Sequence, residues 1–168
     1  MSSQVSPPRA SDALNAWVRL LRGHAVAART LSAQLYAEHG LTINDYEALL
    51  LLARAEGNYL RRVDLADGLH LTASGVTRLL EGLERSGLVE KATCATDARV
   101  TYAVLTDAGR QKLEEASASH VTAVRDLFEE RFTNEELRLL SRLLERLPGA
   151  ASADASECTT ALEPAPAA

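Results

Sequence analysis

The sequence LTASGVTRLLEGLERSGLVEK, residues 71–91, contains a helix whose two faces differ in chemistry. Thr72 is placed to cap its N-terminus, and Gly87 ends it. Helical periodicity gathers the large apolar side chains on one face: Val76, Leu79, Leu80 and Leu83. The opposite face carries Ser74, Gly75, Thr77, Arg78 and Glu81. We therefore predict a helix that packs on a core through one face and presents the other to solvent or to a partner.

The N-terminal half of the polar face has the side chains that entry into a DNA major groove requires. Small residues allow close approach to the bases, hydroxyl groups can bond phosphates or bases, and Arg78 can bond guanine O6 and N7 together. The positive end of the helix dipole also favours phosphate. The solvated face of an ordinary helix has a similar composition, so the helix by itself leaves both interpretations open.

A β-hairpin is predicted directly after this helix. Residues 88–93 and 100–105 are predicted to form two short strands, joined by the tight polar loop 94–99. Arg99 in the loop could enter an adjacent minor groove, where narrow A·T tracts concentrate negative potential. Asp97 would support this wing by holding Arg99 or by capping the loop. A helix followed by a wing indicates DNA binding more strongly than either element alone.

The rest of the chain predicts further helices on both sides of this unit, over about residues 11–39, 42–56, 61–69, 106–130 and 133–147. Thr42 with Asp45 and Thr133 with Glu136 have the spacing of capping pairs. The short third helix is expected to face inward with Val63, Leu65, Ala66 and Leu69.

The predicted fold class is therefore mainly α with a small two-stranded β-wing. A winged helix-turn-helix over about residues 42–105 is flanked by dimerisation helices over about 11–39 and 106–147. Residues 1–10 and 148–168 are poor in large apolar side chains and are predicted to be disordered tails, the second of them rich in alanine and proline.

The flanking helices carry more apolar surface than a winged-helix core of about 70 residues can cover. Leucines occupy more than one face of the last helix: Leu137, Leu139, Leu140, Leu143, Leu144 and Leu147. Burial against a second copy of the chain, with closed two-fold symmetry, would cover them. The alternative is a monomer whose helices cover one another.

The charge distribution limits how the chain could bind DNA. The net charge is −5, but residues 113–168 carry five basic and eleven acidic side chains, whereas residues 60–112 carry eight basic and seven acidic. DNA binding would therefore rest on specific basic residues at an exposed edge. The chain has no apolar run of about 18 residues, no features of a secretory signal and only two cysteines. These features predict a cytoplasmic protein without a membrane partner.

The sequence resembles the MarR family of dimeric transcriptional regulators. The resemblance rests on LTASGVTRLL (71–80), LERSGLVEK (83–91), DAR (97–99) and LTDAG (105–109). It implies a dimer with intertwined chain ends, and recognition helices that address half-sites about one DNA turn apart in a near-palindromic operator. It also implies major-groove roles for Ser74, Gly75, Thr77 and Arg78, and a minor-groove role for Arg99. Ala98 departs from the family pattern, which often has a second arginine there, and Cys94 stands where a polar or acidic residue is common.

The resemblance further implies a pocket between the dimer helices and the DNA-binding lobe, where a small aromatic acid or phenol weakens DNA binding. The candidate ligand-binding residues are Trp17, Arg22, His24, Asp45 and Tyr46. Trp17 offers a stacking surface, and Arg22 or His24 offers a positive partner for a carboxylate or phenolate. The alternative is structural, with Trp17 in the core and Arg22 merely solvated.

Other chemistries find little support in the sequence. No P-loop, G-x-G-x-x-G, G-x-S-x-G or H-E-x-x-H motif occurs, so no enzymatic activity and no cofactor are predicted. The four histidines have no metal-ligand spacing, and the first helix lacks the reactive cysteine of the family's peroxide sensors. We predict a homodimeric, sequence-specific DNA-binding repressor that a small aromatic or phenolic ligand releases from its operator. The alternative is a winged-helix protein–protein interaction module without specificity for duplex DNA.

Overall fold

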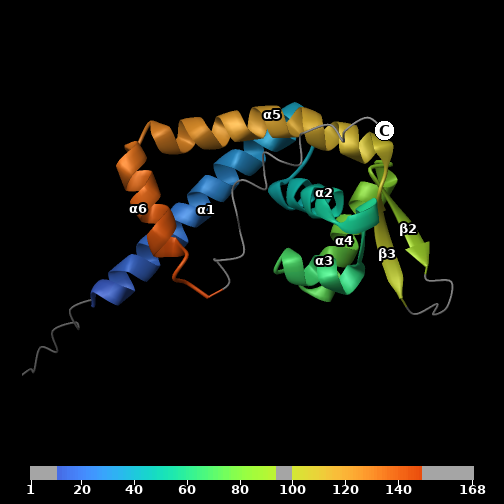
Figure 1. Ribbon diagram of the computed structural model, residues 1–168, viewed down its shortest axis with the longest axis horizontal. Helices are drawn as coiled ribbons and strands as arrows, with labels where there is room; N and C mark the ends of the chain where they lie inside the picture. Colours follow the sequence, from blue (N-terminus) through green and yellow to red (C-terminus); the bar gives the residue numbers. More distant parts are fainter. Residues whose placement is uncertain (1–10, 94–99, 149–168) are drawn as a thin grey trace, which may run out of the picture.

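The computed structural model describes residues 11–93 and 100–148. These residues are mainly helical and include one small antiparallel sheet (Figure 1). The elements follow in the order α1 (Asp12–His39), α2 (Ile43–Arg54), the 3-10 turn η1 (Glu56–Asn58), β1 (Tyr59–Arg61), α3 (Arg62–Gly68), α4 (Ala73–Arg85), β2 (Val89–Thr93), β3 (Thr101–Leu105), α5 (Asp107–Glu129) and α6 (Asn134–Leu144). The predicted fold class is confirmed. The loop residues 94–99 and both predicted tails lie outside the described residues.

Side-chain caps begin every α-helix of the described residues except α3, at the positions that the sequence predicted. The Asp45 carboxylate accepts a hydrogen bond from the backbone N–H of Thr42 at 2.8 Å, and Thr42 Oγ1 accepts one from the Asp45 N–H at 3.2 Å. Thr133 and Glu136 form a second capping box of the same kind. At the other end of α1, Gly40 has a φ of +71°, a conformation in which a Cβ is unfavourable. The helix boundaries therefore follow from local sequence.

The sheet has three strands, not the two that the sequence predicted. β2 and β3 form the expected hairpin, with pairs running from Val89 and Leu105 to Thr93 and Thr101. On the other edge of β3, the three-residue strand β1 pairs antiparallel, and the sheet order is β1-β3-β2. The prediction missed β1 because three residues between a turn and a helix are too few to show strand alternation. This strand ties the start of α3 to the hairpin.

The core of the molecule is a cluster of leucines and other aliphatic side chains beneath the sheet and around α2. Its least exposed large members include Leu35, Leu49, Leu52, Leu65, Val76 and Val89. The prediction that α2 is buried nearly all round is confirmed, because Ala48, Leu49, Leu50 and Leu52 are all buried. The prediction that Val63 faces inward is wrong, since this side chain is 60% exposed. Val63 lies in the first turn of α3 and lines the same surface groove as Ala66, so it stays exposed at the start of the helix, whereas Leu65 and Ala66 are buried.

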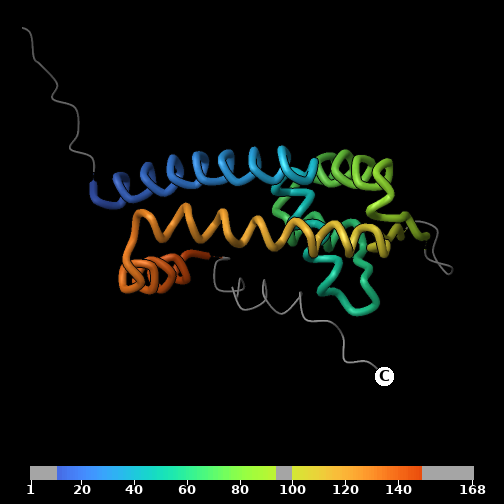
Figure 2. Tube along the Cα trace, turned by 90° about the horizontal axis from the view of Figure 1, so that it is seen from above, coloured from blue at the N-terminus to red at the C-terminus, as the bar shows by residue number. Residues whose placement is uncertain are grey.

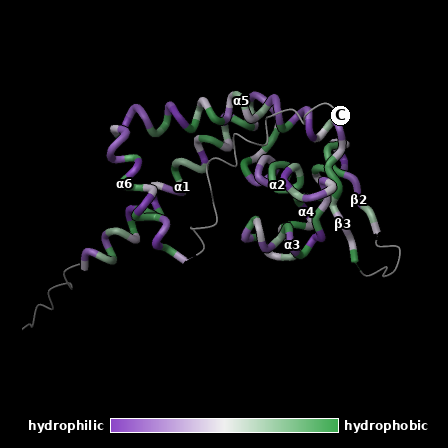
Figure 3. The backbone as a smooth tube through the Cα atoms, in the orientation of Figure 1, coloured by the Kyte–Doolittle hydropathy of each residue, from purple (hydrophilic) through white to green (hydrophobic). Residues whose placement is uncertain are grey.

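The described residues divide into a lobe and an arm. The lobe contains α2, α3, α4 and the sheet, and the arm contains α1, α5 and α6 (Figure 1). α1 and α5 lie antiparallel and side by side (Figure 2). Only Leu31 and Leu35 of α1 are buried, and α6 has no buried residue, although apolar positions recur along both helices (Figure 3). No helix among the described residues combines the length and the hydropathy needed to cross a bilayer.

Candidate nucleic-acid interface

Helix α4 has the two faces that its sequence predicted. Val76, Leu80 and Leu83 are buried against the core of the lobe. On the opposite face, Ser74 and Arg78 are exposed and Thr77 is half-buried. Because α3 precedes α4 across a short turn and the hairpin follows it, the outward face of α4 occupies the position of a recognition helix in a winged helix-turn-helix.

The N-terminus of α4 is closely packed around its cap. Thr72 Oγ1 accepts a hydrogen bond from the Gly75 N–H at 3.1 Å and lies 3.2 Å from Ser74 Oγ. A Cβ on Gly75 would lie 3.2 Å from Thr72 Oγ1 and 3.7 Å from Leu71 Cβ, so any larger residue would crowd the cap. Glycine therefore keeps this end of the helix narrow and leaves the hydroxyl groups of Thr72 and Ser74 at its tip.

A contact that the sequence did not predict joins α3 to the outward face of α4. Arg62 Nη2 donates a hydrogen bond to Thr77 Oγ1, and Thr77 Oγ1 donates its own proton to the Ala73 carbonyl oxygen at 2.7 Å. The sequence offered one signal for it, the adjacent arginines at positions 61 and 62 at the start of a helix. That signal was insufficient because the contact depends on the packing of α3 against α4.

The neighbouring arginine is engaged differently. Arg61 donates from Nε and Nη2 to the two carboxylate oxygens of Asp64, each at 2.6 Å. This hydrogen-bonded pair raises the pKa of Arg61 and lowers the pKa of Asp64. Asp64 thus neutralises Arg61, whereas the ion pairs of the described residues do not include Arg62.

The two arginines lie at the rim of a groove of about 430 Å³ between α3, the start of α4 and the start of β3. Its apolar lining residues include Ala66, Leu71 and Val76, and the acidic Asp67 lines it as well. Arg99, predicted to reach the minor groove, and Asp97, predicted to support the wing, belong to the loop outside the described residues. Of the predicted DNA-binding residues, the structure therefore brings together Ser74, Gly75, Thr77 and Arg78, and it adds Arg62 beside them.

The five candidate ligand-binding residues are not gathered into one site. Trp17, Arg22 and His24 are exposed on α1. Of these, His24 lies near enough to α2 to lower the pKa of Glu47, although burial has the larger and opposite effect on that carboxyl. Tyr46 is only 3% exposed: its hydroxyl lies 3.1 Å from Ser117 Oγ, and its ring centroid lies 4.6 Å from that of His120.

Asp45 differs from the other four because it lines a cavity of about 550 Å³ at the junction of the arm and the lobe. The same cavity is lined by three side chains that are basic or can become so, His39, Arg85 and Lys112. None of these three was predicted, because they come from α1, α4 and α5 and meet only in the folded chain.

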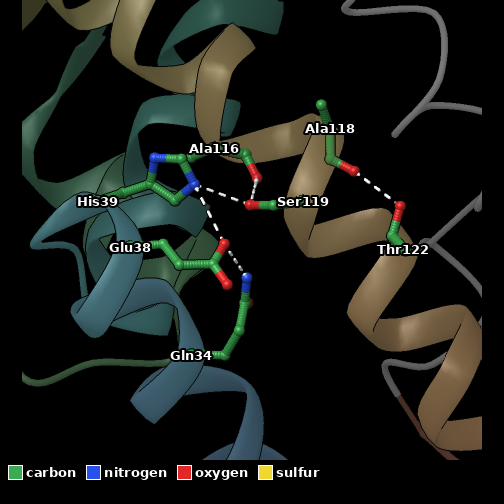
Figure 4. A network of polar contacts seen from close by, with 7 residues as sticks. All are labelled: Gln34, Glu38, His39, Ala116, Ala118, Ser119 and Thr122. Atoms are coloured by element: carbon green, nitrogen blue, oxygen red, sulfur yellow. Dashed lines mark hydrogen bonds and ion pairs between the residues drawn. The ribbon is translucent and has the colours of Figure 1, made fainter.

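A polar network joins α1 to α5 beside this cavity (Figure 4). His39 Nε2 lies 2.7 Å from Ser119 Oγ and 3.7 Å from a carboxylate oxygen of Glu38. Gln34 Nε2 donates to the same Glu38 oxygen at 2.6 Å. The C-terminal turn of α1 is thereby fixed to the middle of α5. Within the described ranges, no cluster of three or more histidine, cysteine or acidic side chains could hold a metal ion.

These features define a winged helix-turn-helix protein with a helical arm. A sequence model described as MarR family matches residues 39–100. The HTH-type transcriptional repressor YetL of Bacillus subtilis is 30% identical over 116 residues, which are 67% of this chain and 69% of the relative.

Two solved structures extend the comparison to nearly the whole fold. AbsC, a MarR family transcriptional regulator from Streptomyces coelicolor, is 30% identical with a TM-score of 0.71, covering 80% of this chain and 91% of that one. Sco3205, a MarR family regulator from the same organism solved in complex with DNA, is 26% identical with a TM-score of 0.74, covering 84% and 89%. The chain belongs to the MarR family of transcriptional regulators, as the resemblance in its sequence implied.

Proposed function

We propose that the chain is a homodimeric repressor that binds a near-palindromic operator and is released by a small aromatic or phenolic ligand. The observation that carries the proposal is the outward face of α4, where exposed Ser74 and Arg78 flank a narrow glycine-containing tip. Such a face suits the major groove better than a protein surface, because it offers hydroxyl and guanidinium donors and almost no apolar area. A regulator of this kind would act in the cytoplasm, where its operator lies.

The proposed contacts divide between two grooves. Ser74, Gly75 and Thr77 would approach the major-groove edge and the phosphates, and Arg78 would bond guanine O6 and N7. Arg99 on the wing, supported by Asp97, would enter the adjacent minor groove. Replacing Arg78 with alanine should cost about 1–3 kcal/mol and relax discrimination at one base pair.

The uncovered faces of the arm support a homodimer. Trp17 on α1 is 57% exposed, and Leu139 and Leu143 on α6 are each 48% exposed. Further exposed apolar side chains on the arm are Leu14, Leu20, Leu21, Val26, Phe132 and Leu147. A surface of this kind favours a partner with the same surface, and a two-fold axis would set two α4 helices about one turn of B-DNA apart.

The cavity at the junction of arm and lobe supports regulation by an acidic ligand. Arg85 and Lys112 offer positive charge there, His39 adds an imidazole ring, and the Asp45 carboxylate opposes the positive charge. A carboxylate or phenolate held between α4 and the arm would favour one spacing of the two lobes over another, and this difference in affinity would shift the dimer away from DNA. Trp17, Arg22 and His24 would join the site only if the partner subunit brought them near. Tyr46 would have to leave Ser117 to reach it.

Selection of bound duplexes from a random pool tests the proposal most directly. We expect enrichment of an inverted repeat with half-site centres about 10 base pairs apart. We also expect an affinity that falls steeply with salt, and release of the selected duplex by at least one member of a panel of aromatic acids. A winged-helix module for protein binding would enrich no sequence and would show no salt-steep affinity for duplex DNA, and that result would contradict the proposal.

A further inference from the structure

We propose that Arg62 binds a backbone phosphate at the edge of the operator's major groove, and that Thr77 positions its guanidinium there. The inference rests on the proposed function, because it names a residue and a contact within the same DNA interface. It starts from the hydrogen bond between Arg62 on α3 and Thr77 on the outward face of α4.

The position of Arg62 is fixed from two sides. It is the first residue of α3, directly after β1, whose residues Leu60 and Arg61 pair with Ala103 and Tyr102 of β3. Its side chain reaches across to α4 and is half-buried between the two helices. Arg62 is therefore anchored to the sheet through its backbone and to the recognition helix through its side chain.

The hydrogen bonds leave most donors of Arg62 available. The single proton of the Thr77 hydroxyl goes to the Ala73 carbonyl oxygen, so the hydroxyl can only accept from Arg62. A guanidinium has five N–H groups, and Thr77 takes one of them. No ion pair among the described residues includes Arg62, in contrast to Arg61 beside Asp64, although the Asp67 side chain lines the same groove. The guanidinium of Arg62 is therefore available to an anionic partner.

A phosphate is the ligand that this arrangement favours. In helix-turn-helix complexes the first helix crosses the DNA backbone while the second enters the groove, and Arg62 comes from the first helix. Guanidinium groups bind phosphate oxygens with two parallel hydrogen bonds. Thr77 would then contribute its hydroxyl to Arg62 and leave its methyl group free to contact a thymine methyl.

The salt dependence of operator binding tests the inference, with R62Q, R62K and T77V compared with the wild-type protein on the duplex selected above. The plot of log K against log salt has a negative slope, and each lost phosphate contact makes it shallower by about 0.9. R62Q should therefore make the slope shallower by about 1.8 in a two-fold symmetric complex. Between 50 and 200 mM salt, wild-type affinity should therefore fall roughly 12-fold more than that of R62Q.

Further variants separate a phosphate contact from other roles. R62K keeps the positive charge and should therefore keep most of the salt dependence of operator binding. T77V should lower the slope partly in the wild-type background and not at all in the R62Q background, because Thr77 acts through Arg62. R125Q removes a charge of the same sign from α5, where Arg125 pairs with Glu129 at 3.7 Å, and should leave the slope unchanged. Thermal unfolding of each variant checks that the fold is intact.

Two results would overturn the inference. R62Q could leave the salt dependence unchanged, whether or not it relaxes discrimination at a single base pair, or T77V could act equally in both backgrounds. Each of these leaves the proposed function in place. Only a wild-type protein without salt-dependent duplex binding would contradict both.

Discussion

Replacing Gly109 with alanine should destabilise the junction between α5 and the β-hairpin. A Cβ at this position would lie 2.1 Å from the Leu88 carbonyl oxygen and 2.8 Å from Leu105 Cδ1. Gly109 lies in the first turn of α5, and its N–H donates to the capping hydroxyl of Thr106 at 3.0 Å. The same hydroxyl donates to the Gly87 carbonyl oxygen at 2.8 Å, so helix, cap and hairpin meet at one point.

The size of the effect follows from these distances. Real Cβ atoms almost never approach another heavy atom within 3.0 Å, so the first turn of α5 would have to move by about 1 Å away from Leu88. That movement breaks or lengthens the 3.2 Å hydrogen bond from the Thr106 N–H to the Leu88 oxygen, at about 0.5–1.5 kcal/mol. Overpacking adds about 1–3 kcal/mol. We expect Gly109→Ala to lower the free energy of unfolding by about 1.5–4.5 kcal/mol.

Gly82→Ala is the matched control, because it is the same chemical change inside α4 at a position with no atom within 4 Å of the new Cβ. It should stabilise the protein by about 0.5–1 kcal/mol, through helix propensity alone. Urea unfolding at one fixed protein concentration measures both, since a dimer's apparent stability depends on concentration. If the Gly109→Ala protein proved as stable as the Gly82→Ala protein, the close packing of α5 against the β-hairpin described above would be refuted.

Three further predictions concern acid stability and assembly. Hydrogen bonds from Thr133 lower the pKa of Glu136 in the folded protein. The stability from this cap should therefore be complete above the pKa of Glu136 in the unfolded chain, and it should be lost as pH falls through the lower pKa in the folded protein. Urea unfolding between pH 3 and 6 should show that E136Q removes this part of the acid dependence. Burial lowers the pKa of His120 in the folded protein, so on acidification the unfolded chain binds a proton at this histidine before the folded chain does. The free energy of unfolding should therefore decline below about pH 6.5, and H120Q should flatten that decline in the same urea series. Leu35 is fully buried, so Leu35→Ala should lower the free energy of unfolding in urea by about 2–5 kcal/mol. L143A should change the fold little and weaken self-association in sedimentation measurements. Equal effects of the two variants on unfolding would contradict the proposed dimer surface.

The sequence predicted those parts of the fold that local chemistry determines. Capping residues marked helix starts such as Thr42 and Thr133, and the apolar face of α4 followed from helical spacing. Features that depend on distant segments escaped prediction. β1 exists because β3 supplies its hydrogen bonds, and the exposure of Val63 depends on where α3 begins after that strand.

The same division holds for the candidate site. Ser74 and Arg78 could be assigned to an outward face because they lie on one helix with a regular period. Arg62 could not, since its role depends on a contact with Thr77, fifteen positions further along the chain. The cavity residues likewise come from separate helices, and only Asp45 among them was a candidate.

The placement of α4 connects the proposed DNA-facing surface to the proposed ligand site. Its N-terminal half carries the exposed Ser74 and Arg78, which we propose face DNA, while Arg85 at its C-terminal end lines the cavity that His39 and Lys112 of the arm also line. α4 has 13 residues and moves as a rigid unit, so a displacement at one end of the helix is transmitted to the other end. A ligand that pulled Arg85 toward the arm would therefore tilt the DNA-facing end. In a dimer the two lobes would tilt symmetrically, and even a small change at each would alter the spacing of the half-sites that the pair can bind.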